Sequence, residues 1–196
     1  MSLHPLFDAL AEVFDQSTAI EHAANDALCE AAGRAGNGPS EATQLATPFL
    51  DVMTAADAHP VCGVIAKTPL PWAPPTTSDD PQYTAHSLPK VHVELLGPDG
   101  LVWSDQVRLG LYGILPGAEY GIRTHPAEEV FVMLAGRAFW KRGDAPYEIH
   151  GPGERSYHPS MMPHATRTGD IAFLSAYVWR GDISTDQYVY EGLPLS

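Results

Sequence analysis

The chain has 196 residues, of which 44% are hydrophobic and 18% are charged, so a buried core is expected rather than intrinsic disorder. Its 11 basic and 24 acidic residues give a formal net charge of -13. Such a charge repels nucleic-acid phosphates and anionic lipids, so neither a nucleic acid nor a membrane surface is expected as a partner.

The N-terminal part of the chain is predicted to be helical. Residues 1–11 lack the basic start and long apolar run of a signal peptide, and no segment approaches the roughly 20 apolar residues of a bilayer span, so we expect a cytoplasmic protein. Apolar residues spaced three and four apart predict helix over 3–34, which the glycines of 33–40 then end. Another short helix is expected within 41–57, interrupted near Pro48.

A proline-rich connection over 68–89 is expected to lie on the barrel surface as an extended arm. From Lys90 onward the pattern changes to short strands separated by glycine and proline turns, which predicts a mainly β protein, a jelly roll or related barrel. The predicted strands cover 91–95, 101–112, 130–140, 172–179 and 187–190. We therefore divide the chain into an N-terminal helical segment with its arm, 1–85, and a barrel, 86–196.

Two segments within the barrel region carry side chains that bind metal ions. Residues 121–136 place His125 four positions before Glu129, and residues 153–164 end in His164. In spacing and residue type, these segments resemble the two short motifs of the cupin superfamily. The resemblance implies a double-stranded β-helix, and we expect two antiparallel strands to point the three side chains at one ion from the inner wall of the barrel.

Two imidazoles and one carboxylate suit a first-row divalent ion and leave positions open for a substrate. One divalent transition metal is therefore expected, with zinc, iron, manganese and nickel as candidates. Cupins commonly have a histidine where this chain has Arg123, which does not ligate metals, so three protein ligands are expected. Alternation along a strand places Glu129 on the face of His125 and leaves Glu128 in solvent.

The other histidines are expected to have no ligand role. His150 and His158 are predicted at the surface or beside the ligands, and the rest are predicted to be structural or exposed: His4, His22, His59, His86 and His92. The second motif also has Met161 where cupins usually have a glycine.

Longer stretches resemble one family within the superfamily. The runs Gly-Ile-Leu-Pro-Gly-Ala-Glu-Tyr at 113–120, His-Pro-Ala-Glu-Glu at 125–129 and Met-Pro-His-Ala-Thr-Arg-Thr at 162–168 are similar to bacterial dimethylsulfoniopropionate lyases of the cupin type. The resemblance implies a metal-dependent β-elimination that releases dimethyl sulfide and leaves acrylate. Tyr120 matches a tyrosine of the family and is the candidate catalytic base.

A small zwitterion of this kind carries a sulfonium cation, which is attracted to the faces of aromatic rings. Four aromatic residues on or beside the predicted strands are therefore candidates for binding the substrate: Trp140, Tyr157, Tyr177 and Trp179. The family lyases have a tyrosine two residues after the metal-binding glutamate, where this chain has Phe131. Phe131 is expected to form a pocket wall, and its missing hydroxyl predicts a slow lyase.

Other functions remain open from the sequence. Two histidines and a carboxylate also hold iron in non-haem dioxygenases, and other cupins bind or isomerise sugars. A small-ligand-binding cupin without activity is a further alternative, and Phe131 is the main argument for it. Cupins often dimerise through barrel edges, which leaves a homodimer open.

Overall fold

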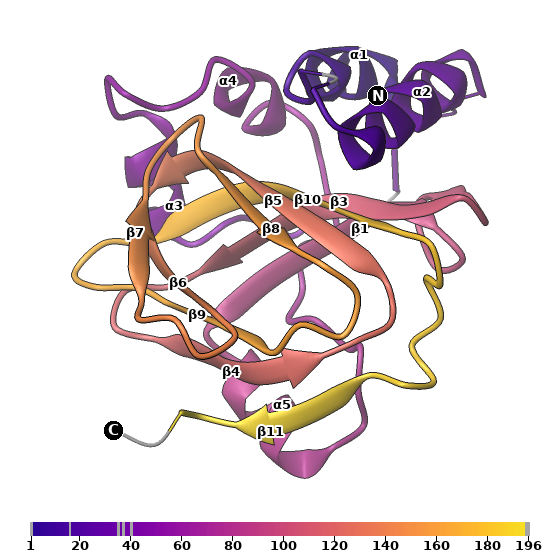
Figure 1. Cartoon of the computed structure of the whole chain (residues 1–196). Helices are drawn as coiled ribbons and strands as arrows, with labels where there is room; N and C mark the ends of the chain where they lie inside the picture. Colours follow the sequence, from indigo (N-terminus) through magenta and orange to yellow (C-terminus); the bar gives the residue numbers. More distant parts are fainter. Residues whose placement is uncertain (1, 16, 35, 37, 40, 195–196) are drawn as a thin grey trace.

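The computed structural model describes residues 2–15, 17–34, 36, 38–39 and 41–194. Two β-sheets face each other and enclose an interior, with the N-terminal helices over one sheet and a short later helix beside the other (Figure 1). This is the mainly β cupin barrel with an N-terminal helical segment that the motifs predict. No helix among the described residues is both long enough and apolar enough to cross a membrane.

The helices precede the barrel in the chain. They are α1 (His4–Ala11), α2 (Ala19–Arg34), α3 (Thr47–Met53), α4 (Cys62–Ile65) and α5 (Pro81–Ser87). The helix expected over 3–34 is thus two helices, and Thr18 caps the second by accepting a hydrogen bond from the backbone N–H of Glu21. Pro48 lies in the first turn of α3 rather than interrupting a helix, because the N–H groups of the first turn have no intrahelical partner.

Strands of the first sheet run in the order β2-β1-β3-β10-β5-β8, and those of the second in the order β11-β4-β9-β6-β7. In chain order they are β1 (Lys90–Gly97), β2 (Val102–Trp103), β3 (Val107–Ile114), β4 (Glu119–Thr124), β5 (Glu128–Gly136), β6 (Ala138–Arg142), β7 (Glu148–His150), β8 (Arg155–His158), β9 (His164–Arg167), β10 (Phe173–Arg180) and β11 (Val189–Gly192). The strand predicted over 130–140 is divided at Gly136, whose φ of +70° favours glycine.

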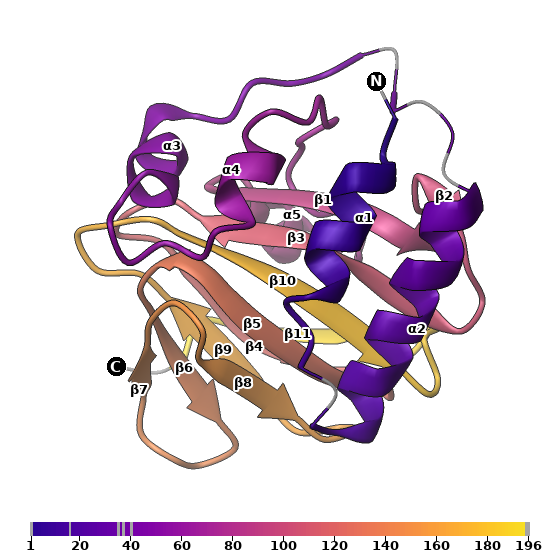
Figure 2. The ribbon, with the colours of Figure 1, turned by 90° about the horizontal axis from the view of Figure 1, so that it is seen from above.

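Alternation along β5 and β10 separates two cores. Val130, Val132 and Leu134 point outward and pack under the helices, together with Ala176 and Val178 of β10. Helices α2 and α3 contact both strands, and Figure 2 shows the N-terminal helices lying across this sheet. Because both faces of the sheet are covered, these strands are apolar almost throughout.

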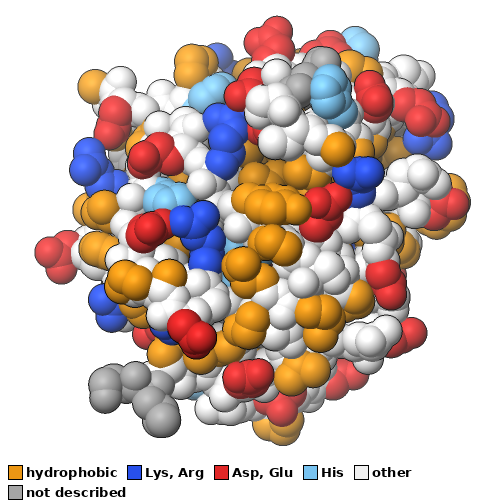
Figure 3. All heavy atoms as spheres, in the orientation of Figure 1, with side chains coloured by type: hydrophobic (Ala, Val, Ile, Leu, Met, Phe, Trp, Pro, Cys, Tyr) orange, Lys and Arg blue, Asp and Glu red, His pale blue; other side chains and the backbone are white. Residues whose placement is uncertain are grey.

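The inner core of the barrel is aromatic. It contains Phe131 of β5, Tyr177 and Trp179 of β10, and residues of the facing sheet such as Trp140. The interior is therefore lined by rings from both sheets, while the aliphatic residues face the helices. Over the molecular face in Figure 3, apolar side chains gather toward the middle and acidic side chains are spread around them.

The proline-rich arm pairs with the barrel edge. Ala73 and His92 form an antiparallel bridge, with the His92 N–H donating to the Ala73 carbonyl at 2.7 Å. The arm also contains α5, which the sequence did not predict and which Asp80 caps by accepting from the N–H groups of residues 82 and 83. The proposed boundary between residues 85 and 86 falls inside α5.

Candidate metal centre

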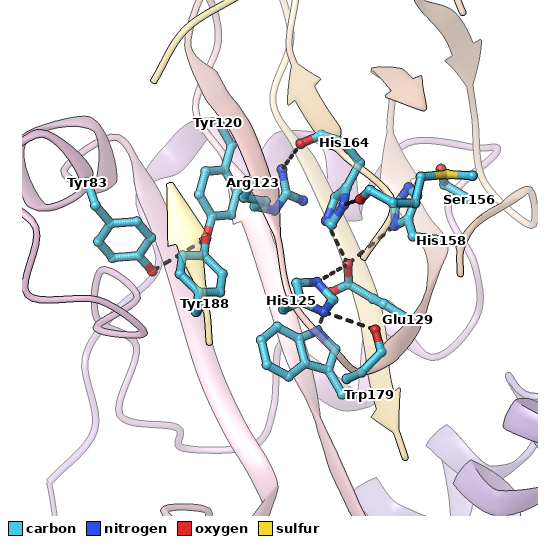
Figure 4. A network of polar contacts seen from close by, with 12 residues as sticks. Tyr83, Tyr120, Arg123, His125, Glu129, Ser156, His158, His164, Trp179 and Tyr188 are labelled. Carbon is cyan, nitrogen blue, oxygen red and sulfur yellow. Dashed lines mark hydrogen bonds and ion pairs between the residues drawn. The ribbon is translucent and has the colours of Figure 1, made fainter. Parts of the chain in front are cut away.

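Three elements bring His125, Glu129 and His164 together (Figure 4). His125 lies in the turn that follows β4, Glu129 lies near the start of β5, and His164 begins β9. One ligand atom from each side chain lies within 4.8 Å of the others, and all three residues are buried. The site thus joins residues carried by both sheets.

The expected position of His125 on a strand is wrong, because residues 125–127 form a turn between β4 and β5. The alternation argument therefore does not apply to this pair, although Glu129 does face His125. Glu128 points away from the site, as expected, but it is half-buried rather than free in solvent. It pairs with Arg180 at 3.0 Å and accepts a hydrogen bond from the hydroxyl of Tyr157 at 2.8 Å.

Backbone carbonyls fix the tautomers of the two histidines of this cluster. Nδ1 of His125 lies 3.0 Å from the carbonyl of Ala127, and Nδ1 of His164 lies 2.8 Å from the carbonyl of Met162. A carbonyl only accepts, so each Nδ1 carries the hydrogen and each Nε2 presents a lone pair. Both Nε2 atoms are buried and have no hydrogen-bond partner.

The two lone pairs face an ionised carboxylate. Nε2 of His164 is 3.1 Å and Nε2 of His125 is 3.5 Å from Oε2 of Glu129. Burial opposes ionisation of Glu129, and the hydrogen bonds that its two oxygens accept from Trp179 and His158 favour the ionised form. Burial and the charge of Arg123 hold the pKa of His164 well below 6.5, so this imidazole is neutral.

Three electron-pair donors facing one another without hydrogens repel unless a cation lies between them. Two ligands about 2.1 Å from one ion are separated by roughly 3.0–3.4 Å at octahedral or tetrahedral angles, close to the distances above. The residues therefore fit a divalent metal ion. Two nitrogens and one oxygen on one side also leave room for further ligands from the cavity.

Two further side chains orient Glu129. The indole Nε1 of Trp179 donates to Oε1 at 2.5 Å, and Nδ1 of His158 lies 3.2 Å from Oε2. The hydroxyl of Ser156 lies 2.9 Å from the other ring nitrogen of His158 and donates to it. Such supporting hydrogen bonds hold a metal-binding carboxylate in position.

His158 is thus beside the ligands, and the alternative surface position is wrong. It is fully buried and stacks on His164 with ring centroids 4.2 Å apart. Burial lowers its pKa to about 4, so it is neutral. In the sequence, the spacing of Ser156 and His158 is that of two residues on the same face of a strand. This strand was not predicted because residues 155–158 are polar.

Met161 adopts a left-handed backbone conformation with φ of +61°, which explains why cupins usually have glycine here. Its backbone N–H donates to the carbonyl of His125 at 2.9 Å. This hydrogen bond ties the loop before β9 to the turn that carries the first ligand, and so it links the two motifs.

A cavity of about 350 Å³ opens beside Glu129. Its inner part is lined by Tyr112, Tyr120, Arg123, Phe131, Tyr177 and Trp179, and its outer part by residues 71 and 73–77 of the arm together with His92, Glu94 and Arg108. A cavity of this size holds a small molecule rather than a polymer. The arm therefore forms one wall of the site.

Phe131 lies on the cavity wall as expected, and Tyr177 and Trp179 also line the cavity. The hydroxyl of Tyr177 bonds Nε2 of His92 at 2.7 Å, a contact that the sequence did not predict. The ring of Tyr177 passes over Gly110, where a Cβ would meet it at 3.0 Å. His92 is also held by the arm, so the arm, β1 and β10 shape this end of the cavity.

Trp140 and Tyr157 do not line the cavity, so these two expectations are wrong. Trp140 is fully buried behind Phe131, with ring centroids 4.5 Å apart. Tyr157 follows Ser156 on β8 and points to the opposite face, where 42% of the residue is exposed. Neither ring is placed to contact a ligand beside Glu129.

Tyr120 lines the cavity from β4 and belongs to a group of tyrosines (Figure 4). Its hydroxyl lies 2.5 Å from the hydroxyl of Tyr188 and donates to that of Tyr83 at 3.4 Å. Burial, reinforced by these neighbours, raises the pKa of Tyr120 well above 10. As it stands, Tyr120 is a neutral phenol whose proton is shared with other hydroxyl groups.

Comparison with known proteins agrees with this arrangement. Residues 45–175 match the family model for dimethylsulfoniopropionate lyase. The curated dimethylsulfoniopropionate lyase DddQ of Ruegeria pomeroyi is 41% identical over 92 residues, which cover 46% of this chain and 45% of that protein. The aligned part thus spans about half the length of this curated relative.

Two solved structures resemble the whole described chain. The crystal structure of dimethylsulfoniopropionate lyase DddQ from Ruegeria pomeroyi covers 95% of this chain and 96% of its own, with 26% identity and a TM-score of 0.59. A chain from the crystal structures of the dimethylsulfoniopropionate lyases RdDddP and RnDddQII covers 95% of both chains, with 22% identity and a TM-score of 0.64. The second likeness supports the fold.

Proposed function

The chain belongs to the dimethylsulfoniopropionate lyase family, and from this we propose that it is a metal-dependent carbon–sulfur lyase. The proposed reaction is a β-elimination: a base removes a proton from the carbon next to the carboxylate, and the carbon–sulfur bond breaks. The products are acrylate, dimethyl sulfide and a proton. One observation carries the proposal, namely that the ligand atoms of His125, Glu129 and His164 converge beside a small aromatic cavity.

The proposed ligands of the ion are these three side chains, and zinc, iron, manganese or nickel suits two imidazoles and one carboxylate. A divalent ion bound there supplies a Lewis acid that polarises a carboxylate and acidifies the neighbouring C–H bond. His158 and Trp179 contribute by holding Glu129 in one orientation through its two oxygens.

Aromatic rings of the cavity are proposed to receive the sulfonium group. Phe131, Tyr177 and Trp179 present ring surfaces on one side of the cavity, and a cation over such a face gains roughly 0.5–2 kcal/mol. The same rings exclude water from the reacting carbon. The positions of Trp140 and Tyr157 argue against a similar role for those two residues.

Tyr120 is proposed as the catalytic base. It lines the cavity, and its hydroxyl contacts Tyr188, which offers a route for the proton once Tyr120 has accepted it. Its raised pKa makes the phenolate scarce near neutral pH, and Phe131 provides no second phenol. We therefore propose a lyase of low rate, in agreement with the expectation from Phe131.

The reaction is tested by incubating the metal-loaded protein with dimethylsulfoniopropionate and following both products. Equal amounts of dimethyl sulfide and acrylate, formed without oxygen uptake, support the lyase. Oxygen consumption coupled to product formation supports the non-haem iron dioxygenase instead. A cytoplasmic location and a homodimer stay predictions. Sedimentation of the purified protein measures its mass in solution and so tests the homodimer.

A further inference from the structure

Arg123 is a buried cation without an anionic partner. The residue is 1% exposed, and no carboxylate oxygen of the described residues lies within 4.0 Å of its guanidinium nitrogens. Its Nη1 donates to the backbone carbonyl of His164 at 3.4 Å, a long hydrogen bond, and its Nη2 has no partner. An unpaired charge in such a position is strongly unfavourable unless an anion accompanies it.

Neighbouring groups do not supply that anion. The guanidinium carbon lies 3.9 Å from the ring centre of Tyr120, whose burial keeps its hydroxyl protonated. The carboxylate of Glu129 is already occupied, because Trp179 and His158 contact its two oxygens and the ligand histidines face it. A metal ion at that site adds positive charge close to Arg123 and increases the need for an anion.

A second buried basic side chain, Lys90, lies nearby. Its Nζ lies 3.8 Å from the centre of the same Tyr120 ring and also has no hydrogen-bond partner. Burial, with the charge of Arg123 as a smaller cause, lowers its pKa to about 6, so it is mostly neutral near pH 7. Arg123 is therefore the fixed positive charge on this side of the interior, since guanidinium does not lose its proton.

Arg123 also lines the cavity, together with Tyr120, Phe131 and Glu129. A guanidinium presents its N–H groups as a planar fork that matches the two oxygens of a carboxylate. We propose that Arg123 binds the carboxylate of a small organic acid in this cavity, in the position where cupins commonly have a metal-binding histidine. That this carboxylate belongs to a sulfonium substrate rests on the function proposed above.

The inference divides the cavity into two parts. The carboxylate lies beside Arg123 and the metal centre, and the opposite end of a small zwitterion extends toward the ring of Tyr177, which His92 holds at the end of the cavity that the arm forms. Arg123 then selects carboxylates over neutral analogues, because a neutral group leaves the buried guanidinium unpaired.

The test measures binding without turnover, using propionate as the probe and propionamide as its neutral counterpart. The full chain is melted with each compound, in chelator-treated and in metal-loaded form, because a bound ligand raises the melting temperature. We expect propionate to stabilise both forms and propionamide to have little effect. Equal stabilisation by the two compounds overturns the inference, and so does equal stabilisation by inorganic phosphate, which indicates an unselective anion site.

Two variants test whether Arg123 is the residue that binds propionate. Arg123→Gln is expected to weaken propionate binding by roughly 10- to 100-fold, the worth of lost charge-assisted hydrogen bonds. Arg167→Gln is the matched control, because Arg167 is exposed on β9 and stacks on Tyr147 at 4.3 Å, outside the cavity. An unchanged affinity in Arg123→Gln, or an equal loss in Arg167→Gln, contradicts the assignment.

Arg123→Lys covers the case in which the glutamine variant does not fold. Lysine keeps the charge and loses the planar fork, so a clear loss of affinity is expected, and an undiminished response overturns the proposal. The outcome is separate from that of the lyase assay. If the protein releases no dimethyl sulfide but binds propionate through Arg123, the lyase proposal fails and the role of Arg123 is supported. If the protein is an active lyase whose propionate affinity does not depend on Arg123, only the role of Arg123 is refuted.

Discussion

The indole of Trp179 connects directly to the carboxylate of Glu129 by a hydrogen bond of 2.5 Å. The two residues lie opposite each other in the register of β10 and β5. The same indole stacks on His125, with ring centroids 4.0 Å apart. A residue expected to face a sulfonium group therefore also positions two of the three proposed metal ligands.

Replacing Trp179 with Phe separates these two roles. The phenyl ring retains an aromatic face in the cavity but does not donate a hydrogen bond to Glu129. We expect the metal affinity to fall by about 10- to 100-fold, the usual effect of losing a supporting contact. Competition with a chromogenic chelator measures the change. Trp103→Phe is the control, because Trp103 is 60% exposed; an affinity that falls equally in both variants refutes the positioning role.

The ligand assignment predicts a contrast between adjacent glutamates. Glu129→Gln is expected to lose most of the bound metal, whereas Glu128→Gln is expected to retain it, because Glu128 pairs with Arg180 on the outer face. His125→Ala and His164→Ala each remove one of three protein donors and should resemble Glu129→Gln. Elemental analysis of the purified variants measures the metal content. Full occupancy in both histidine variants contradicts the site.

Phe131→Tyr tests the missing phenol. The ring lies on the inner face of β5, two residues after Glu129, with Tyr177 directly opposite on β10. A tyrosine there adds a second candidate base, and general base catalysis contributes about 10²–10⁴-fold, so we expect at least a tenfold higher rate of dimethyl sulfide release. Tyr120→Phe should lower the rate of the unmodified chain. If Tyr120→Phe has no effect, the base is another residue.

Stability should depend on pH through Lys90. Its folded pKa of about 6 lies below the unfolded value of 10.5. Between these values the unfolded chain binds a proton that the folded chain does not, so the free energy of unfolding rises with pH, by at most about 1.4 kcal/mol per pH unit. Denaturant unfolding between pH 6.5 and 9.5 measures this slope.

Lys90→Met should remove that contribution. The variant is expected to be more stable than the unmodified chain near pH 7, with the difference narrowing as the pH approaches 10. Lys67→Met is the control, because Lys67 is exposed. A difference between Lys90→Met and the unmodified chain that does not change with pH indicates that Lys90 is charged in the folded state.

Motif spacing was enough to predict the barrel and the clustering of His125, Glu129 and His164, since both depend on local runs of residues. It was not enough to place His125, because an alternation argument assumes a strand and residues 125–127 form a turn. The outward position of Tyr157 follows from its alternation with Ser156 and His158. Because residues 155–158 are polar, they were not predicted to form a strand, and the alternation could not be used.

Contacts between distant segments could not be predicted from the sequence. The pairing of His92 with Tyr177, and the bridge between the arm and β1, join residues that no local pattern relates. The isolation of Arg123 could not be predicted from the sequence either. Burial and the lack of a partner are properties of the packed interior.

We propose that a metal ion held by His125, Glu129 and His164 is required for cleavage of dimethylsulfoniopropionate. Titrating a divalent metal into the chelator-treated protein, while measuring dimethyl sulfide in the headspace, tests it most directly. We expect a rate that rises with added metal and levels off near about one equivalent per chain, with no rise in Glu129→Gln. Any of three results contradicts a role for the metal centre: a rate of release that does not depend on the metal, a Glu129→Gln variant as active as the unmodified chain, or no dimethyl sulfide at any metal concentration.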